Sequence, residues 1–233
     1  LNLNTSSLSF PPLLVLRAFF KFGLKLLYHY KAKKRSLVCT LRIKPAPLFS
    51  IMQQHALIIQ QTSQWIQQII IKHNFCPFAA RVVDHIDYQL ASDPSPAGIL
   101  SQLSLLWEKL DQQPAIEPSF LIFPQAFSNF YDYLEMLHLA EAHLAATGYE
   151  GIYQLASFHP QYCFAGSTED DPANYTNRSP YPMFHLLREA SLEQAIAHHP
   201  DPEGIPAQNI ERAQTLGLKQ MKAERDQIIL PPH

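Results

Sequence analysis

The run Phe120–Phe123 (FLIF) constrains the fold more than any other stretch, because it is short, wholly apolar and followed at once by Pro124. A proline cannot donate to a sheet ladder, so the run must end there. Continuous apolar runs of this length are typical of a central strand that is covered on both faces. The sequence therefore predicts a layered fold, with helices on both sides of a sheet.

Two amphipathic segments flank this strand and supply the covering layers. The first begins at Ser95-Pro96, a serine cap followed by a proline in the first helical turn, and then repeats apolar residues at helical spacing. The second extends from about Ser128 to Thr147 and stops before Gly148, a residue that suits a helix C-terminus. Both segments are expected to bury one face against the sheet.

The remaining elements alternate in type along the chain. The sequence predicts a helix over Leu57–His73, an edge strand over Val82–Leu90 and a strand over Ile152–Phe158. A helix is then expected from Ser179 to Ala190, and a last one over Pro206–Gly217. Because whole helices separate most strands, we expect an α/β fold with a small, mostly parallel sheet of three or four strands, packed with helices in a single domain.

Charge and composition divide the chain near Met52. Residues 1–51 carry nine Lys/Arg and no acid, whereas the rest carries nine Lys/Arg and twenty Asp/Glu, a net charge of −11. We interpret residues 1–51 as a basic, apolar N-terminal extension outside the fold, residues 52–218 as the α/β domain and residues 219–233 as a loosely ordered C-terminal tail. No membrane partner is expected unless residues 1–51 are a genuine part of the protein, in which case they could form a basic amphipathic helix on an anionic membrane surface.

The composition of the domain excludes several classes of function. Its net charge of −11 lacks the basic face of a nucleic-acid binder, so no nucleic-acid partner is expected. The sequence has no glycine-rich nucleotide loop and no GxSxG elbow. Its three cysteines form no CxxC motif and no disulfide framework, which predicts a cytoplasmic location. Cys76 is interpreted as a small, buried hydrophobe in a turn.

The segment Gly151–Ser191 is dense in polar side chains and is predicted to form the wall of a site. His159 follows a predicted strand end, where α/β sheets place their ligands, and His185 lies on a predicted helix. Both are candidate catalytic acid–base residues. Arginines and the N–H groups of a helix start hold anions, so the segment is expected to bind an anionic substrate. The candidate substrate-binding residues are Arg178, Arg188, Asn174, Asn177 and Ser179.

The same segment allows a divalent metal as a cofactor. His185 and Glu189 are four residues apart and would share one face of the predicted helix, where Asp170 or Asp171 could join them as ligands. A polar cluster of this size can also be a structural network that fixes a long loop to the domain. If the cluster is a site, its histidines, arginines and acids should converge in one pocket over the end of the sheet.

Five blocks of the sequence are distinctive enough to compare with known families. They are Cys76–Ala79 (CPFA), Leu121–Pro124 (LIFP), Tyr153–Pro160 (YQLASFHP), Asn174–Ser191 (NYTNRSPYPMFHLLREAS) and Ile205–Ile210 (IPAQNI). Together they resemble an uncharacterised bacterial family, domain-of-unknown-function family 1415, from about Thr62 to Gly217. That family has no established activity, so the resemblance implies a unit of folding and no reaction.

Two functions stay open on these grounds. The first is a small cytoplasmic enzyme that binds an anionic small molecule in a pocket lined by His, Arg and Asp. The second is a non-catalytic ligand- or partner-binding protein whose polar cluster is structural. The first requires His159 and His185 to lie in one site, whereas the second does not.

Overall fold

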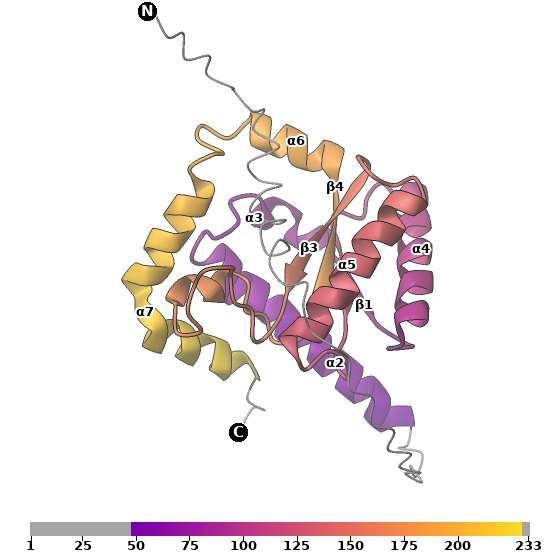
Figure 1. The fold of residues 1–233 in the computed structure, drawn as a ribbon, viewed down its shortest axis with the longest axis horizontal. Helices are drawn as coiled ribbons and strands as arrows, with labels where there is room; N and C mark the ends of the chain where they lie inside the picture. Colours follow the sequence, from indigo (N-terminus) through magenta and orange to yellow (C-terminus); the bar gives the residue numbers. More distant parts are fainter. Residues whose placement is uncertain (1–47, 230–233) are drawn as a thin grey trace, which may run out of the picture.

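The computed structural model describes residues 48–229, and a four-stranded sheet forms their centre (Figure 1). The strands are β1 (Asp87–Leu90), β2 (Ser119–Ile122), β3 (Tyr153–Phe158) and β4 (Met183–Arg188). Their order in the sheet is β1-β2-β4-β3. β1 and β2 are parallel, whereas β4 is antiparallel to both of its neighbours. The fold is α/β as expected, but the sheet is mixed and mostly antiparallel, so the prediction of a mostly parallel sheet is wrong.

The direction of each strand follows from its connection. Helix α4 lies between β1 and β2, and helix α5 lies between β2 and β3, so these three strands run the same way. Only a short 3-10 helix, η4, lies between β3 and β4. Without a whole helix to carry the chain back, β4 enters between β2 and β3 and runs against both. The helices are α2 (Leu48–Trp65), η2 (Ile66–Ile71), α3 (Ala79–Val82), η3 (Val83–His85), α4 (Pro96–Gln112), α5 (Phe130–Ala146), η4 (Pro172–Thr176), α6 (Glu189–Ala197) and α7 (Ile205–Ile229).

Helices cover both faces of this sheet. α4 and α5 pack on one face, where Trp107, Tyr133 and Phe184 are fully buried. α2, the π-helix η2 and α7 pack on the other face around Trp65 and Phe120. All four residues of β2 are buried between the two layers, which confirms the central, doubly covered strand.

The segment Met183–Arg188 is a strand, although the sequence predicts a helix from Ser179 onward. A short apolar run is compatible with both the helical and the strand period of side chains. In the structure the side chains alternate as in a strand: Phe184 faces the α4/α5 core, whereas His185 faces the α2/α7 side. Ser179 does not cap a helix, because its hydroxyl donates to the carbonyl oxygen of Tyr181 at 2.6 Å. The helix α6 starts only after the strand has ended.

Helix α7 runs past Gly217, where a φ of 78° kinks it, and continues to Ile229. Met221 and Ile228 lie beyond the kink and are buried in the α2/η2 core, so most of the segment expected to be a loose tail is helical and packed. The predicted extension over residues 1–51 lies almost wholly outside the described residues. Within residues 48–229, no helix combines the length and the apolar character that crossing a bilayer requires.

Candidate functional site

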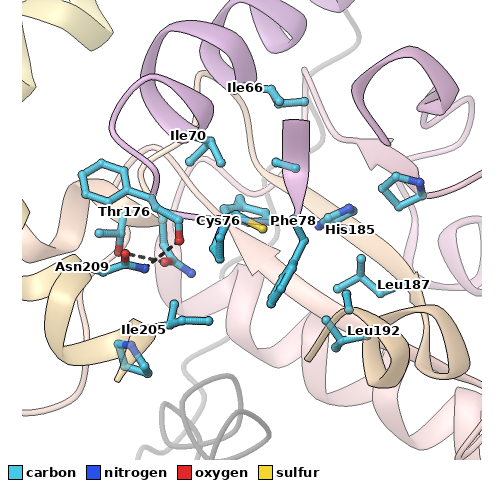
Figure 2. A pocket seen from close by; sticks show the side chains of 18 of the residues that line it. Ile66, Ile70, Cys76, Phe78, Thr176, His185, Leu187, Leu192, Ile205 and Asn209 are labelled. Atoms are coloured by element: carbon cyan, nitrogen blue, oxygen red, sulfur yellow. Dashed lines mark hydrogen bonds between the residues drawn. The ribbon is translucent and has the colours of Figure 1, made fainter. Parts of the chain in front are cut away.

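A cavity of about 1140 Å³ lies on the α2/α7 face of the sheet (Figure 2). Its floor is formed by side chains of β2, β3 and β4, and its walls by η2, α3, the loop over residues 164–167, α6 and the first half of α7. In the figure, Ile66 and Ile70 lie at the top, Leu192 and Ile205 at the bottom, and His185 between them. This volume is large enough to enclose a drug-sized molecule.

The walls of the cavity are mainly apolar. Trp65, the last residue of α2, meets Phe158 of the floor edge to face with ring centroids 5.1 Å apart, and Phe120 lies beside Phe158. The π-helix η2 supplies Ile66 and Ile70. A π-helical turn is rare and recurs at functional sites, since its wider turn displaces side chains from their α-helical positions.

His185 is the polar group of the floor. It projects from β4, and its ring stacks on the Phe120 ring at 4.1 Å with an interplanar angle of 4°. The Nε2 atom is buried and has no hydrogen-bond partner within the described residues. Burial lowers the pKa of His185 to about 3, so the imidazole is neutral at physiological pH. A neutral imidazole can donate or accept one hydrogen bond at each nitrogen.

A second lining residue, Trp65, also has a buried nitrogen without a partner, its Nε1. The Trp65 side chain is 1% exposed. Buried polar atoms in folded proteins are nearly always hydrogen-bonded, so two orphaned nitrogens in one cavity lining call for an explanation. A bound molecule with polar atoms would provide one if the side chains shift enough to present these buried nitrogens to the cavity.

Cys76 also lines the cavity, in the turn that follows η2. Burial raises the pKa of its thiol, although hydrogen bonds from the backbone of Phe78 and Ala79 act the other way. The thiol is therefore protonated at neutral pH, whereas a nucleophilic cysteine must be a thiolate. Cys76 is thus a small, unreactive side chain as expected, although it is half-buried against the cavity and not fully buried.

The predicted polar cluster does not converge in one pocket. His185, Asn177, Asp171 and Arg188 contribute to the cavity lining, whereas His159 does not. His159 packs on Phe130 and Tyr133 of the α4/α5 side, so the two candidate histidines lie on opposite faces of the sheet. The remaining candidates outside the lining are Asp170, Asn174, Arg178, Ser179 and Glu189.

His159 is held by the backbone at both ring nitrogens. Its Nε2 donates to the carbonyl oxygen of Phe127 at 2.7 Å, and its Nδ1 accepts from the N–H of Gln161 at 3.0 Å. These partners fix the neutral tautomer, and burial lowers the pKa of the ring. Phe127 has a φ of 57°, so the bond to its carbonyl helps to hold a strained turn. The arrangement gives His159 a structural role.

Arg188 is engaged with the end of α4. Its guanidinium donates to the carbonyl oxygens of Leu110, Gln113 at 3.3 Å and Ile116 at 3.4 Å, and to the hydroxyl of Tyr153 at 3.0 Å. Unpaired carbonyls and the negative end of the helix dipole occur at a helix C-terminus, so a cation is stabilising there. This use of the donors leaves little of the guanidinium for a substrate.

The other substrate-binding candidates fasten the loop between β3 and β4. Arg178 donates to the carbonyl oxygens of Tyr162 at 2.9 Å and Glu169 at 2.8 Å. Asn174 is fully buried; its Oδ1 accepts from the N–H of Phe164 at 3.0 Å, and its Nδ2 donates to the carbonyl of Thr168 at 2.8 Å. These bonds satisfy a long, irregular backbone, which is the structural alternative foreseen for the cluster.

The metal candidates are separated in the fold. Within the described residues, no group of three or more His, Cys, Asp or Glu side chains is arranged to hold a metal ion. Asp170 is exposed, and Asp171 caps η4 by accepting from the N–H of Ala173 at 2.9 Å. His185 belongs to β4 and Glu189 begins α6, so the helical spacing that suggested a shared face does not exist.

A family model described as "Protein of unknown function (DUF1415)" matches residues 57–223. The chain belongs to this family. The match confirms the resemblance seen in the sequence blocks, whereas no curated protein and no solved structure matches the chain. Every residue that lines the cavity, from Trp65 to Ile210, falls within the DUF1415 region. The CPFA block, Cys76–Ala79, lies entirely in the cavity wall.

Proposed function

We propose that this DUF1415 protein is a non-catalytic binding protein that holds a small molecule with a largely apolar body in this cavity. The observation that carries the proposal is the orphaned Nε2 of His185 on the floor of an apolar space of about 1140 Å³. Ligand pockets combine apolar walls with a few polar groups that fix orientation. His185 fits that description, since a small shift of its ring would present the buried Nε2 to the cavity, where a ligand hydroxyl or carbonyl would satisfy it.

The chemistry of the lining favours binding over catalysis. The thiol of Cys76 is kept protonated, and the imidazole of His185 rests on the Phe120 ring. A general base needs a pKa near the working pH, and the pKa of about 3 at His185 is far below it. The other hypothesis, an enzyme for an anionic substrate, has less support because Arg178 and Arg188 are engaged with backbone carbonyls.

A matched pair of substitutions on α6 tests the proposal. Ala195 lines the cavity, whereas Ala190 is exposed and lies outside it. We expect Ala195→Trp to occupy ligand space and to weaken binding at least about tenfold, and Ala190→Trp to bind like the parent. A screen of small apolar molecules by thermal shift, followed by calorimetric titration, measures this. A ligand present at about 100 times its Kd stabilises the folded state by about 2.7 kcal/mol, which a melting curve resolves.

The unliganded melting temperatures of both tryptophan variants serve as the control, because an unfolded variant would also fail to bind. The proposal is wrong if no molecule in the screen shifts the melting of the parent. It is also wrong if a folded Ala195→Trp variant retains the affinity of the parent.

A further inference from the structure

Exposed residues of the cavity lining lie on α3 and at the end of α6, and we take this part of the lining as a mouth of the cavity. Three of its exposed lining residues, Arg81, Gln194 and His198, belong to or directly follow these two elements. Phe78 and His199 meet edge to face at 5.8 Å, which brings the start of α3 close to the end of α6. Polar side chains therefore gather at this mouth, and a second polar part of the lining consists of Ser167, Asp171, Thr176, Asn177 and Asn209, while the rest of the interior is mainly apolar.

Arg81 is the uncommitted charge at this mouth. It is exposed, and within residues 48–229 it has no ion pair and no hydrogen bond from its side chain. The acids of the lining are engaged elsewhere: Glu117 accepts from the hydroxyl of Ser191 at 2.6 Å and lies 3.7 Å from Arg188, and Asp171 caps η4. The cavity thus offers an incoming molecule an available positive charge.

The sign of this charge is informative because the rest of the domain is acidic. Residues 52–233 carry nine Lys/Arg against twenty Asp/Glu. A cation at the mouth of a cavity attracts anions locally, even where the overall field of the protein repels them. An apolar wall behind one cation is complementary to a molecule with an apolar body and an anionic end.

We infer that the ligand of this cavity is an amphipathic carboxylate, with its carboxylate at Arg81 and an apolar body that carries a hydroxyl or carbonyl inward to His185. The inference rests on the proposed function and adds the class of ligand. A single guanidinium matches one planar carboxylate in a two-pronged hydrogen bond. A doubly charged phosphate would be expected to find further cations at the mouth, and the described lining supplies none that is uncommitted.

Two fluorescent probes with the same body test the inference: 1-pyrenebutyrate, which is anionic, and 1-pyrenebutanol, which is neutral. In fluorescence titrations of the full chain, we expect the parent to bind the carboxylate about tenfold more tightly than the alcohol, the effect of one charge-assisted contact. Arg81→Gln should remove this preference, because it should weaken the binding of 1-pyrenebutyrate and leave the binding of 1-pyrenebutanol unchanged. Arg81→Lys, which retains the charge but not the planar fork, should keep part of it.

Arg212→Gln is the matched control, since Arg212 is an exposed arginine of α7 that does not line the cavity. It should leave both affinities unchanged. The inference is overturned if the parent binds the two probes equally, or if Arg81→Gln leaves their ratio as in the parent; the proposed function survives both results. If neither probe binds the parent, the inference is overturned as well, whereas the proposed function is decided separately by the screen of apolar molecules and by Ala195→Trp.

Discussion

Replacement of Arg188 by methionine is expected to lower the free energy of unfolding by roughly 2–4 kcal/mol, because it leaves several backbone carbonyls without a donor. The guanidinium serves the carbonyl oxygens of Leu110, Gln113 and Ile116 and the hydroxyl of Tyr153. Only 18% of the side chain is exposed, so water can replace few of these bonds. Urea denaturation with an unchanged m-value measures the loss.

Arg81→Met is the matched control for this substitution. The Arg81 side chain is exposed and has no partner among the described residues, so the same change should alter stability by no more than about 0.5 kcal/mol. Arg188→Lys should lower the free energy of unfolding nearly as much as Arg188→Met. The compact ammonium group of lysine cannot reach all the carbonyl oxygens that the planar guanidinium contacts at once. If Arg188→Met unfolds at the urea concentration of the parent, the structural role is refuted and the guanidinium becomes available for an anion.

The expected result at Arg188 reverses its interpretation from the sequence. The sequence shows that an arginine lies near other polar residues, but it does not show backbone partners. The same is true of Arg178 and Asn174, whose hydrogen bonds go to carbonyls and N–H groups of the loop. A dense polar segment thus predicted a site, when much of it satisfies the backbone of an irregular connection.

Local chemistry made most helices and strands predictable. Ser95 caps α4 as expected, since its hydroxyl oxygen accepts from the N–H of Gly98 at 3.1 Å. Gly148 follows α5 with a φ of 82°, and the buried β2 agrees with the apolar run at Phe120–Phe123. These features depend on neighbours in the sequence, which is why one sequence suffices to find them.

β4 was missed because its identity depends on distant partners. Its register places His185 opposite Phe120 of β2 and Ala156 of β3, and nothing within the run itself records these pairings. The helix-like start at Ser179 and the four-residue spacing of His185 and Glu189 then favoured the wrong period. The sheet direction and the metal hypothesis depended on that one element and changed with it.

The cavity could not be predicted for a different reason. Its walls are isoleucines, leucines and aromatic rings from separate elements, and such residues are the same ones that fill a core. Whether apolar side chains fill a space or leave a cavity depends on the distance between the packed layers, and a difference smaller than one side chain is enough to change the outcome. The CPFA block contributes to the family resemblance, but a sequence alone does not say that it faces a cavity.

Phenylalanine in place of each candidate histidine is expected to shift stability in opposite directions. His159→Phe leaves the carbonyl of Phe127 and the N–H of Gln161 unpaired, which should lower the free energy of unfolding by about 2–4 kcal/mol. His185→Phe removes an orphaned nitrogen and adds an apolar ring beside Phe120, which should raise it by about 1 kcal/mol at pH 7. Urea denaturation of both variants beside the parent measures the difference.

Acid should widen the gap between His185→Phe and the parent. The pKa of His185 is about 3 in the folded protein against 6.5 for the unperturbed group, so between these values the unfolded chain binds a proton that the folded protein excludes. Stability present above pH 6.5 is therefore lost as the pH falls toward 3, by up to about 1.4 kcal/mol per pH unit. The phenylalanine variant lacks this loss, and its unfolding midpoint should fall less steeply over that range.

The ligand affinity of His185→Phe tests whether this histidine has a function in the cavity. Stability and function often oppose each other at binding sites, so a buried polar side chain that lowers stability is a candidate for a functional role. We therefore expect His185→Phe to be more stable than the parent and also to bind apolar molecules that carry a hydroxyl or carbonyl about tenfold less tightly. His159→Phe, measured well below its melting temperature, should keep the affinity of the parent. A His185→Phe variant that is less stable at every pH, with binding intact, would show that the nitrogen has a partner within the fold and that the cavity does not depend on it.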